Sequence, residues 1–310
     1  MKILLLGRDG QVGWELQRSL APLGEVVALG RNALQNPDGL CGDLTNLDGL
    51  RATVRQLRPN VIVNAAAHTA VDKAESELEL AHLLNAQAPG VLAQEAEALG
   101  AWLVHYSTDY VFDGNGETPW QESDATGPLS VYGRTKLEGE QAIAAACPRH
   151  LIFRTCWVYA ARGNNFAKTM LRLAQTRDTL NVIDDQIGSP TGADLIADVT
   201  AQALGQVRGA GADAALRLAG IYHLAASGTT SWFSYANYVL AQAVIAQPAI
   251  KIVAKTVNPV ASSAFPTAAR RPHNSRLNTT RLQTVFGLQL PSWQVGVTRM
   301  LNEIDHGPKL

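Results

Sequence analysis

The feature that most constrains the fold is a regular alternation of short apolar runs and amphipathic helical patterns over residues 1–155. The apolar runs are nearly continuous, which is typical of parallel strands buried on both faces. Parallel strands joined by helices form right-handed crossovers, so the pattern predicts an α/β fold with a Rossmann-type, doubly wound parallel sheet. The expected strands are 3–6, 26–29, 61–63, 102–106 and 151–154, and the expected helices are 12–20, 47–57, 75–85, 90–99 and 131–146.

After residue 155 the alternation becomes irregular, which indicates a smaller C-terminal α/β lobe. We expect residues 1–155, rejoined by about 184–225, to form the Rossmann domain, and residues 156–183 and 226–310 to form the lobe. The elements expected here are helices at 165–175, at 191–206 with Thr191 as the cap, at 235–245 and at 293–304, strands at 180–183, 222–225 and 250–254, and a loop at 259–278.

Composition excludes several classes of protein. The formal net charge is -1, so long-range attraction to nucleic acid or to an anionic membrane is not expected. No apolar run approaches the length that spans a bilayer. Three cysteines without CxxC spacing favour unpaired thiols in a reducing compartment. Because the first strand begins at residue 2, no cleavable signal is expected, and the predicted location is the cytoplasm.

A glycine-rich loop connects the first strand to the first helix. Gly7, Gly10 and Gly13 frame this loop, with Gln11 and Val12 between the last two. Glycines permit a tight turn and let the backbone touch a diphosphate at the positive end of a helix. Because the loop stands between a strand and a helix, as a dinucleotide site requires, these five residues are predicted to bind a dinucleotide cofactor.

Cofactor preference is indicated at the end of the second strand. An acidic residue there would bind the ribose 2′-hydroxyl of NADH, but this chain has Arg31, which could pair with a 2′-phosphate. We therefore expect NADPH to be preferred, with NADH use left open and a solvated Arg31 as the alternative. The other residues expected beside the cofactor are Asp43 and Leu44, after a presumed further strand, and Ala65, Ala66 and Ala67.

The chemistry is expected on the helix at Val131–Ala146. Tyr132 and Lys136 are four residues apart, so they lie on one helix face, and Ser130 is the predicted cap. An ammonium near a phenol would lower the phenol's pKa. Gly133 in a helix interior costs about 1 kcal/mol relative to alanine, which suggests that another segment packs closely there. Thr108 ends an upstream strand, where function collects in parallel sheets, and could hydrogen-bond a substrate carbonyl.

Several segments resemble the dTDP-4-dehydrorhamnose reductases, a family of extended short-chain dehydrogenases. They are AAHTAVDKAE (66–75), YSTDYVFDG (106–114), VYGRTKL (131–137), RTCWVY (154–159) and RPHNS (271–275). The resemblance covers almost the whole chain and departs at Cys156, where the family often has serine.

The resemblance implies that Thr108, Tyr132 and Lys136 form a catalytic triad. It implies hydride transfer from NADPH to the C4 ketone of dTDP-4-dehydro-L-rhamnose, with Tyr132 protonating the alkoxide, to give dTDP-L-rhamnose. Lys136 would lower the pKa of Tyr132 and hold the nicotinamide ribose.

The dTDP-sugar is expected to contact the C-terminal lobe. By resemblance Asp109 borders the sugar, and Trp157 lines the pocket or packs in the core. A group of arginines suits a substrate diphosphate, with a merely basic loop as the alternative. This group is Arg270, Arg271, Arg276 and Arg281, and the expected substrate residues are Thr108, Asp109, Tyr132, Trp157, Arg271 and Asn274.

Some reductases of this family dimerise around magnesium held by acidic residues. The matching positions are Glu15, Asp194 and Glu303, one of them shorter by a methylene, and ordinary surface carboxylates are the alternative. A homodimer with Mg²⁺ at its interface is thus one expectation. Two other functions stay open: a sugar-nucleotide epimerase or dehydratase of the same superfamily, and a non-catalytic subunit resembling the regulatory partner of methionine adenosyltransferase.

Overall fold

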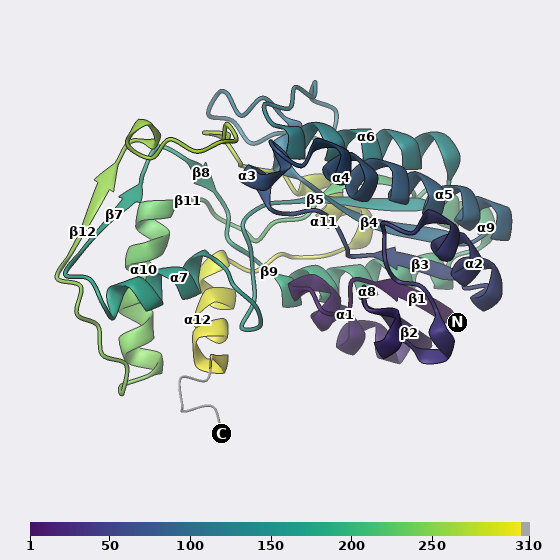
Figure 1. The fold of residues 1–310 in the computed structure, drawn as a ribbon, viewed down its shortest axis with the longest axis horizontal. Helices are drawn as coiled ribbons and strands as arrows, with labels where there is room; N and C mark the ends of the chain where they lie inside the picture. The colour runs from purple at the N-terminus through teal and green to yellow at the C-terminus, as the bar shows by residue number, and fades with distance from the viewer. Residues whose placement is uncertain (305–310) are drawn as a thin grey trace.

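A six-stranded parallel sheet forms the centre of the computed structural model, which describes residues 1–304 (Figure 1). The strand order is β10-β5-β4-β3-β1-β2, and every pairing is parallel. This confirms the Rossmann-type fold, because the order reverses beside β1 as in a doubly wound sheet. The strands are β1 (Lys2–Leu6), β2 (Glu25–Leu29), β3 (Val61–Asn64), β4 (Trp102–Thr108), β5 (His150–Thr155) and β10 (Gly220–His223).

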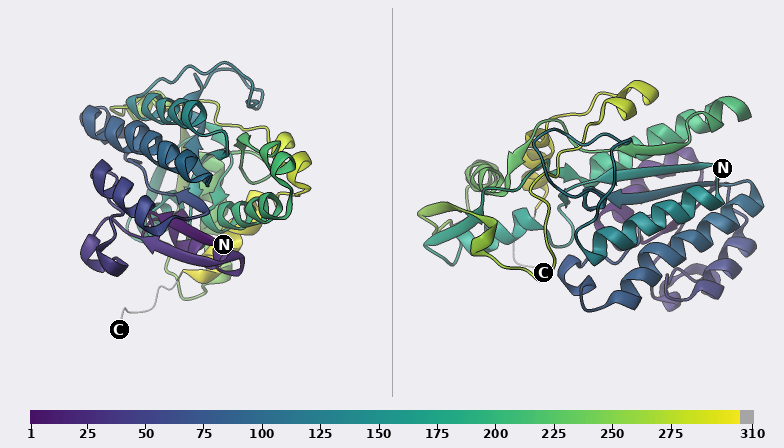
Figure 2. Two further views of the ribbon diagram at one scale, coloured as in Figure 1. Left: turned by 90° about the vertical axis from the view of Figure 1, so that its right-hand side faces the viewer. Right: turned by 90° about the horizontal axis from the view of Figure 1, so that it is seen from above.

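Helices cover both faces of the sheet (Figure 2). On one face α1 (Gln11–Leu20) packs against α8 (Ala193–Gly209), and on the other α5 (Ala88–Leu99) packs against α2 (Leu47–Leu57) and α6 (Val131–Ala146). Two separate clusters of buried apolar side chains, one under each helical layer, pack against the sheet. Shorter helices are α3 (Val71–Ala74), α4 (Leu78–His82) and α9 (Ala212–Leu216), with a π-turn at Leu83–Gln87 and 3₁₀ turns at Ala21–Leu23, Ala33–Gln35, Pro37–Gly39, Asp109–Val111 and Ser262–Ala264.

A smaller lobe stands at the side of the sheet, on the left in Figure 1. Its helices α7 (Phe166–Ala174) and α12 (Trp293–Glu303) pack against α10 (Trp232–Ala246). Three two-stranded pairs complete it. They are β7 (Thr179–Ile183) with β12 (Thr256–Val260), β8 (Ile187–Gly188) with β11 (Thr230–Ser231), and β6 (Val158–Tyr159) with β9 (Thr191–Gly192).

The chain crosses between the two parts more often than the sequence suggests. As expected, α8 and β10 return to the sheet. In contrast, β8 lies in the lobe, where it pairs with β11. Helix α11 (Thr280–Phe286) belongs to the sheet domain and not to the lobe, because Leu282 and Phe286 are buried in the core beside α8 and β10. The region 184–225 is therefore divided between the lobe and the sheet domain, and residues 280–290 pack with the sheet domain.

Four local expectations are wrong. Residues 250–254 form no strand, because Val253 and Ala254 both donate their amides to the Ala174 carbonyl, and the ladder with β7 starts at Thr256. Gly192, not Thr191, precedes helix α8. The expected helix at 75–85 is divided among α3, α4 and the π-turn, and residues 40–46 contain no strand before Asp43.

No helix within residues 1–304 is long and apolar enough to cross a membrane.

Candidate active site

The glycine loop lies at the carboxyl edge of the sheet. Gly7 has a φ of +86°, and its amide donates to the Leu29 carbonyl over 3.0 Å. A Cβ on Gly7 would stand 2.8 Å from the backbone of Ala65, and one on Gly13 would stand 2.0 Å from the Gly7 carbonyl oxygen. Both glycines are therefore required by close backbone contact between β1, β3 and helix α1.

The start of α1 suits a diphosphate. Gly10 precedes the helix, and no side chain of the described residues caps its first amides. Uncapped amides at a helix N-terminus bind anions, so this cradle fits a dinucleotide. Of the two neighbouring residues predicted to bind it, Gln11 accepts a hydrogen bond from Asn165 over 3.2 Å, and Val12 packs on the core.

A second group of predicted cofactor residues surrounds a pocket of about 360 Å³ beside β2. Arg31 and Asp43 both line it, while Leu44 is buried. Arg31 is exposed and has no partner among the described residues. Arg8 in contrast donates to the carbonyls of Ala28 and Gln35 over 3.1 and 2.9 Å. Within residues 1–304, Arg31 is therefore unpaired, whereas Arg8 is not, and its predicted contact with a 2′-phosphate stays a prediction.

The three alanines after β3 are half-buried at the same edge. Ala65 donates its amide to the Leu6 carbonyl over 3.0 Å, and Ala66 donates to Asn64 Oδ1 over 3.2 Å. Ala67 continues this segment. The small side chains leave the backbone open beside the glycine loop.

The amino end of α6 is held from three sides. Ser130 caps it as predicted, accepting the Gly133 amide over 3.2 Å, and Glu75 accepts the Val131 amide over 2.8 Å. A Cβ on Gly133 would stand 2.2 Å from the Tyr110 carbonyl oxygen. The close packing expected at this glycine is thus confirmed, and through it helix α6 packs directly against the loop after β4.

Tyr132 faces Thr108 across this contact. Although part of Tyr132 stays exposed, its phenol is enclosed by protein, and this desolvation raises its pKa above the ordinary value. A hydrogen bond with Thr108 offsets a part of that rise. The phenol is therefore protonated at neutral pH, as a proton donor must be.

Lys136 is buried one turn further along α6. Its Nζ donates to the Tyr106 carbonyl over 2.6 Å and lies 3.0 Å from His105 Nε2. Burial lowers the pKa of Lys136 to about 8, and the Glu140 carboxylate partly counteracts this. Desolvation dominates the pKa of Tyr132, and Lys136 is not among its causes, so the expected lowering of this pKa by Lys136 stays a prediction.

Thr108 and Asp109 form the third side of the site. The Thr108 hydroxyl donates to Asp109 Oδ1 over 3.0 Å and accepts the Tyr110 amide over 3.2 Å. Burial raises the pKa of Asp109 to about 6, although nearby hydroxyls of Ser275 and Thr108 favour the charged form. Asp109 Oδ2 makes no hydrogen bond of ordinary geometry within the described residues.

Of the predicted arginine group, Arg271 lies nearest to this site. It pairs with Asp72 over 2.7 Å and interacts with the Tyr110 hydroxyl. The Tyr110 ring lies edge-on to the Tyr132 ring, with 5.5 Å between the two ring centroids. No contact of the other three with this site is found within residues 1–304. Arg270 is exposed, Arg276 donates to Asn274 and Arg281 stacks on Tyr222. The cluster expected to bind a diphosphate therefore does not converge.

Two predicted substrate residues have structural partners. Asn274 is buried, and its amide nitrogen donates to the carbonyls of Thr118 and Asn115, so it shapes the loop and is not free for a ligand. Trp157 adopts a left-handed φ of +47° and stacks on Trp232 at 3.6 Å. Trp157 is half-buried, at the junction of the lobe and the sheet.

The three carboxylates expected to hold magnesium do not fit a metal within one chain. Glu15 lies 3.5 Å from Arg18, while Asp194 and Glu303 share Arg299 at 3.4 and 2.9 Å. No group of three metal-ligating side chains occurs within residues 1–304. Arg18 and Arg299 already neutralise the carboxylate charges that would otherwise attract a metal ion.

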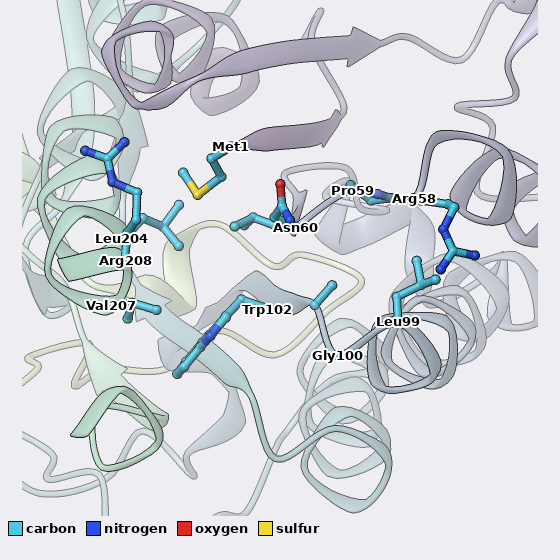
Figure 3. A pocket seen from close by; sticks show the side chains of 12 residues that line it. Met1, Arg58, Pro59, Asn60, Leu99, Gly100, Trp102, Leu204, Val207 and Arg208 are labelled. Atoms are coloured by element: carbon cyan, nitrogen blue, oxygen red, sulfur yellow. The ribbon is translucent and has the colours of Figure 1, made fainter. Parts of the chain in front are cut away.

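A pocket of about 390 Å³ lies away from this chemistry. Met1, Asn60 and Trp102 line it at the amino ends of the strands, opposite the carboxyl edge that bears Thr108 (Figure 3). Because function in parallel sheets collects at the carboxyl edge, we place the site by its side chains and not by this pocket.

Sequence reasoning missed the buried residues behind the site. His105 and Asn64 contact each other at 3.2 Å, and Glu140 binds Arg154 over 2.7 Å at the back of α6. The signals available were polar residues inside otherwise apolar strands, and a glutamate one turn after Lys136. Alone, neither signal identifies a partner.

Comparisons with known proteins show which family the chain resembles. Residues 1–306 match the family described as RmlD substrate binding domain. The chain is 57% identical over 307 residues to the dTDP-4-dehydrorhamnose reductase of Escherichia coli (strain K12), covering 98% of each chain.

Two solved structures are similar over almost the whole chain. The dTDP-4-dehydrorhamnose reductase of Clostridium acetobutylicum is 35% identical with a TM-score of 0.87, covering 98% of this chain and 99% of that one. The Bacillus anthracis reductase, in complex with NADP, is 33% identical with a TM-score of 0.83, covering 97% and 99%.

Proposed function

The chain belongs to the RmlD substrate binding domain family, and on that premise we propose that Thr108, Tyr132 and Lys136 carry out its reaction. The chain is an NADP-dependent oxidoreductase that reduces the C4 keto group of dTDP-4-dehydro-L-rhamnose to dTDP-L-rhamnose. This is the last step of dTDP-rhamnose biosynthesis.

The observation that carries the assignment of residues is the hydrogen bond between Tyr132 and Thr108 at the carboxyl edge of the sheet. NADPH, when bound, supplies the hydride that the C4 carbon receives. The protonated Tyr132 phenol gives its proton to the C4 oxygen, and the Thr108 hydroxyl orients that oxygen. Lys136 holds the ribose hydroxyls of the cofactor, and Arg31 its 2′-phosphate.

The substrate is held at the junction of the two lobes. Asp109 borders the sugar and Trp157 lines its far side. Arg271 approaches the diphosphate. Asn274 supports the loop that carries Arg271.

The direct test is NADPH oxidation with dTDP-4-dehydro-L-rhamnose, with the configuration of the new C4 centre determined by NMR. We expect one NADPH consumed for each dTDP-L-rhamnose formed. An epimerase or dehydratase would recycle its redox equivalents without net consumption, and a regulatory subunit would turn over no ketosugar. Neither alternative is favoured by the relatives found.

We propose a homodimer as the assembly and assign magnesium no part in the chemistry. Trp14 on α1 and Val295 on α12 are large apolar side chains, 47% and 62% exposed, and lie on the helices that carry Glu15 and Glu303. Exposed apolar side chains on surface helices favour association. The carboxylates of these helices are held by Arg18 and Arg299 instead of a cation.

A further inference from the structure

A buried line of polar groups joins the backbone after β3 to Lys136. The Ala66 amide lies 3.2 Å from Asn64 Oδ1, Asn64 Nδ2 lies 3.2 Å from His105 Nδ1, and His105 Nε2 lies 3.0 Å from Lys136 Nζ. The side chains of Asn64, His105 and Lys136 come from β3, β4 and α6, and these three residues are no more than 2% exposed. With so little contact to solvent, these groups must satisfy one another.

The direction of the first hydrogen bonds is determined. A backbone amide can only donate, so Ala66 requires the Asn64 oxygen on its side and leaves the Asn64 nitrogen facing His105. His105 Nδ1 must then accept. A neutral imidazole with an accepting Nδ1 carries its proton on Nε2, and this proton points toward Lys136.

At Lys136 the number of donors exceeds the number of acceptors. An ammonium only donates, so a charged Lys136 and the Nε2–H of His105 would present two donors to each other at 3.0 Å. A neutral amine has a lone pair and accepts, while it still donates to the Tyr106 carbonyl. Each of these hydrogen bonds therefore has one donor and one acceptor only when Lys136 is uncharged.

We propose that Asn64 and His105 are positioning residues that couple the charge of Lys136 to the tautomer of His105. With the proton on Nε2, Lys136 is an amine. When Lys136 becomes an ammonium, His105 must move its proton to Nδ1 and give up the Asn64 contact. This inference rests on the proposed role of Lys136.

The groups around Lys136 are consistent with this coupling. On α6, Tyr132 is neutral and Glu140 favours the ammonium, but Glu140 is bound to Arg154 of β5 over 2.7 Å. On β4, burial and the Lys136 charge lower the pKa of His105 well below its ordinary value, so the imidazole stays neutral. Because burial lowers the pKa of Lys136 to about 8, we expect the exchange near that pH.

The test is an NMR titration of the full chain without cofactor, labelled with ¹⁵N-histidine, between pH 6 and 10. Long-range ¹H–¹⁵N correlations distinguish the two tautomers, and His105→Gln identifies the signal. We expect His105 to change from Nδ1–H to Nε2–H with a midpoint near pH 8. His223 is the internal control, because its Nδ1 faces the Trp120 carbonyl at 3.0 Å and should keep one tautomer throughout.

Asn64→Asp is the decisive variant. A carboxylate accepts from both Ala66 and His105, so His105 should stay in the Nδ1–H form up to pH 10, and Lys136 should stay charged to higher pH. Asn64→Ala, which adds no charge, should raise the midpoint by about one unit or more. A His105 tautomer that is constant in the wild type, or a midpoint that neither variant moves, would overturn the proposal.

The pH profile of kcat/KM supplies the second measurement. If Lys136 works as an ammonium, the basic limb of the wild-type profile should move upward in Asn64→Asp, which a purely structural role for Asn64 would not produce. Failure of this inference is distinguishable from failure of the proposed function. An active reductase with a constant tautomer contradicts only the coupling, whereas a pH-dependent tautomer without ketosugar turnover contradicts only the function.

Discussion

Gly133 lies so close to Tyr110 that a Cβ on the glycine would stand 2.2 Å from the tyrosine carbonyl oxygen. This contact sets the distance between α6, which carries Tyr132 and Lys136, and the strand end that carries Thr108. It explains why the helix keeps a residue with a low helix propensity at this position.

Replacing Gly133 with alanine should therefore displace the helix. We expect Gly133→Ala to lower the free energy of unfolding by about 1–3 kcal/mol, as overpacking does, and to reduce kcat by about 100-fold through misplacement of Tyr132. Gly205→Ala in α8 is the matched control, because its nearest neighbour is 4.0 Å away, and it should stabilise the chain slightly. Denaturant titration and NADPH oxidation measure both effects. Equal behaviour of the two variants would contradict the steric explanation.

Removal of the phenolic hydroxyl tests the proton donor. Tyr132→Phe should lower kcat by roughly 10²–10⁴, the usual contribution of one acid–base group, while NADPH affinity by fluorescence titration stays within about threefold. Tyr238→Phe in α10, whose hydroxyl contacts Thr298 on α12, is the control and should keep wild-type kcat. Wild-type turnover in the Tyr132 variant would show that another group protonates the product.

Asp109 should make stability depend on pH. Its folded pKa is about 6, above the ordinary 3.8, so the folded chain binds an extra proton between these values. The stabilisation is therefore complete below about pH 4 and is lost as the pH rises through 6. We expect Asp109→Asn to be more stable than the wild type at pH 8 by up to about 3 kcal/mol, and the difference to shrink toward pH 4. Thermal unfolding across this range measures it, and a difference that does not vary with pH would contradict the buried carboxyl.

Arg31 should determine the choice of cofactor. Its guanidinium is exposed and has no partner within residues 1–304, beside the pocket that Asp43 also lines. Arg31→Ala should therefore raise KM for NADPH about tenfold and leave KM for NADH unchanged. Initial rates with both cofactors provide the internal control. An equal effect on the two would mean that Arg31 does not contact the 2′-phosphate.

The arginine pairing of Glu15, Asp194 and Glu303 predicts that Mg²⁺ does not control assembly. Sedimentation profiles in Mg²⁺ and in chelator should be the same. A dimer that forms with the metal and dissociates in chelator would restore the magnesium site expected from the family resemblance, with Arg18 and Arg299 displaced. In that case Arg299→Ala should make dimer formation depend more strongly on Mg²⁺.

Local patterns in the sequence determined the parallel sheet and the main catalytic candidates. Apolar runs and helical spacing predict the strands, and Tyr132 and Lys136 share a face because a helix has 3.6 residues per turn. Thr108 could be placed opposite them because parallel strands end at one edge. Each of these inferences needs only residues that are near one another in the chain.

Only the tertiary structure decided the protonation states and the partners. The pKa values of Tyr132, Lys136 and Asp109 depend on burial, which no spacing reveals. The contact of Asn64 with His105 joins residues 41 positions apart, and the loop bonds of Asn274 join positions more than 150 apart. Desolvation and long-range hydrogen bonds arise when distant segments meet, so a linear sequence can indicate which residues react but not how their protons are arranged.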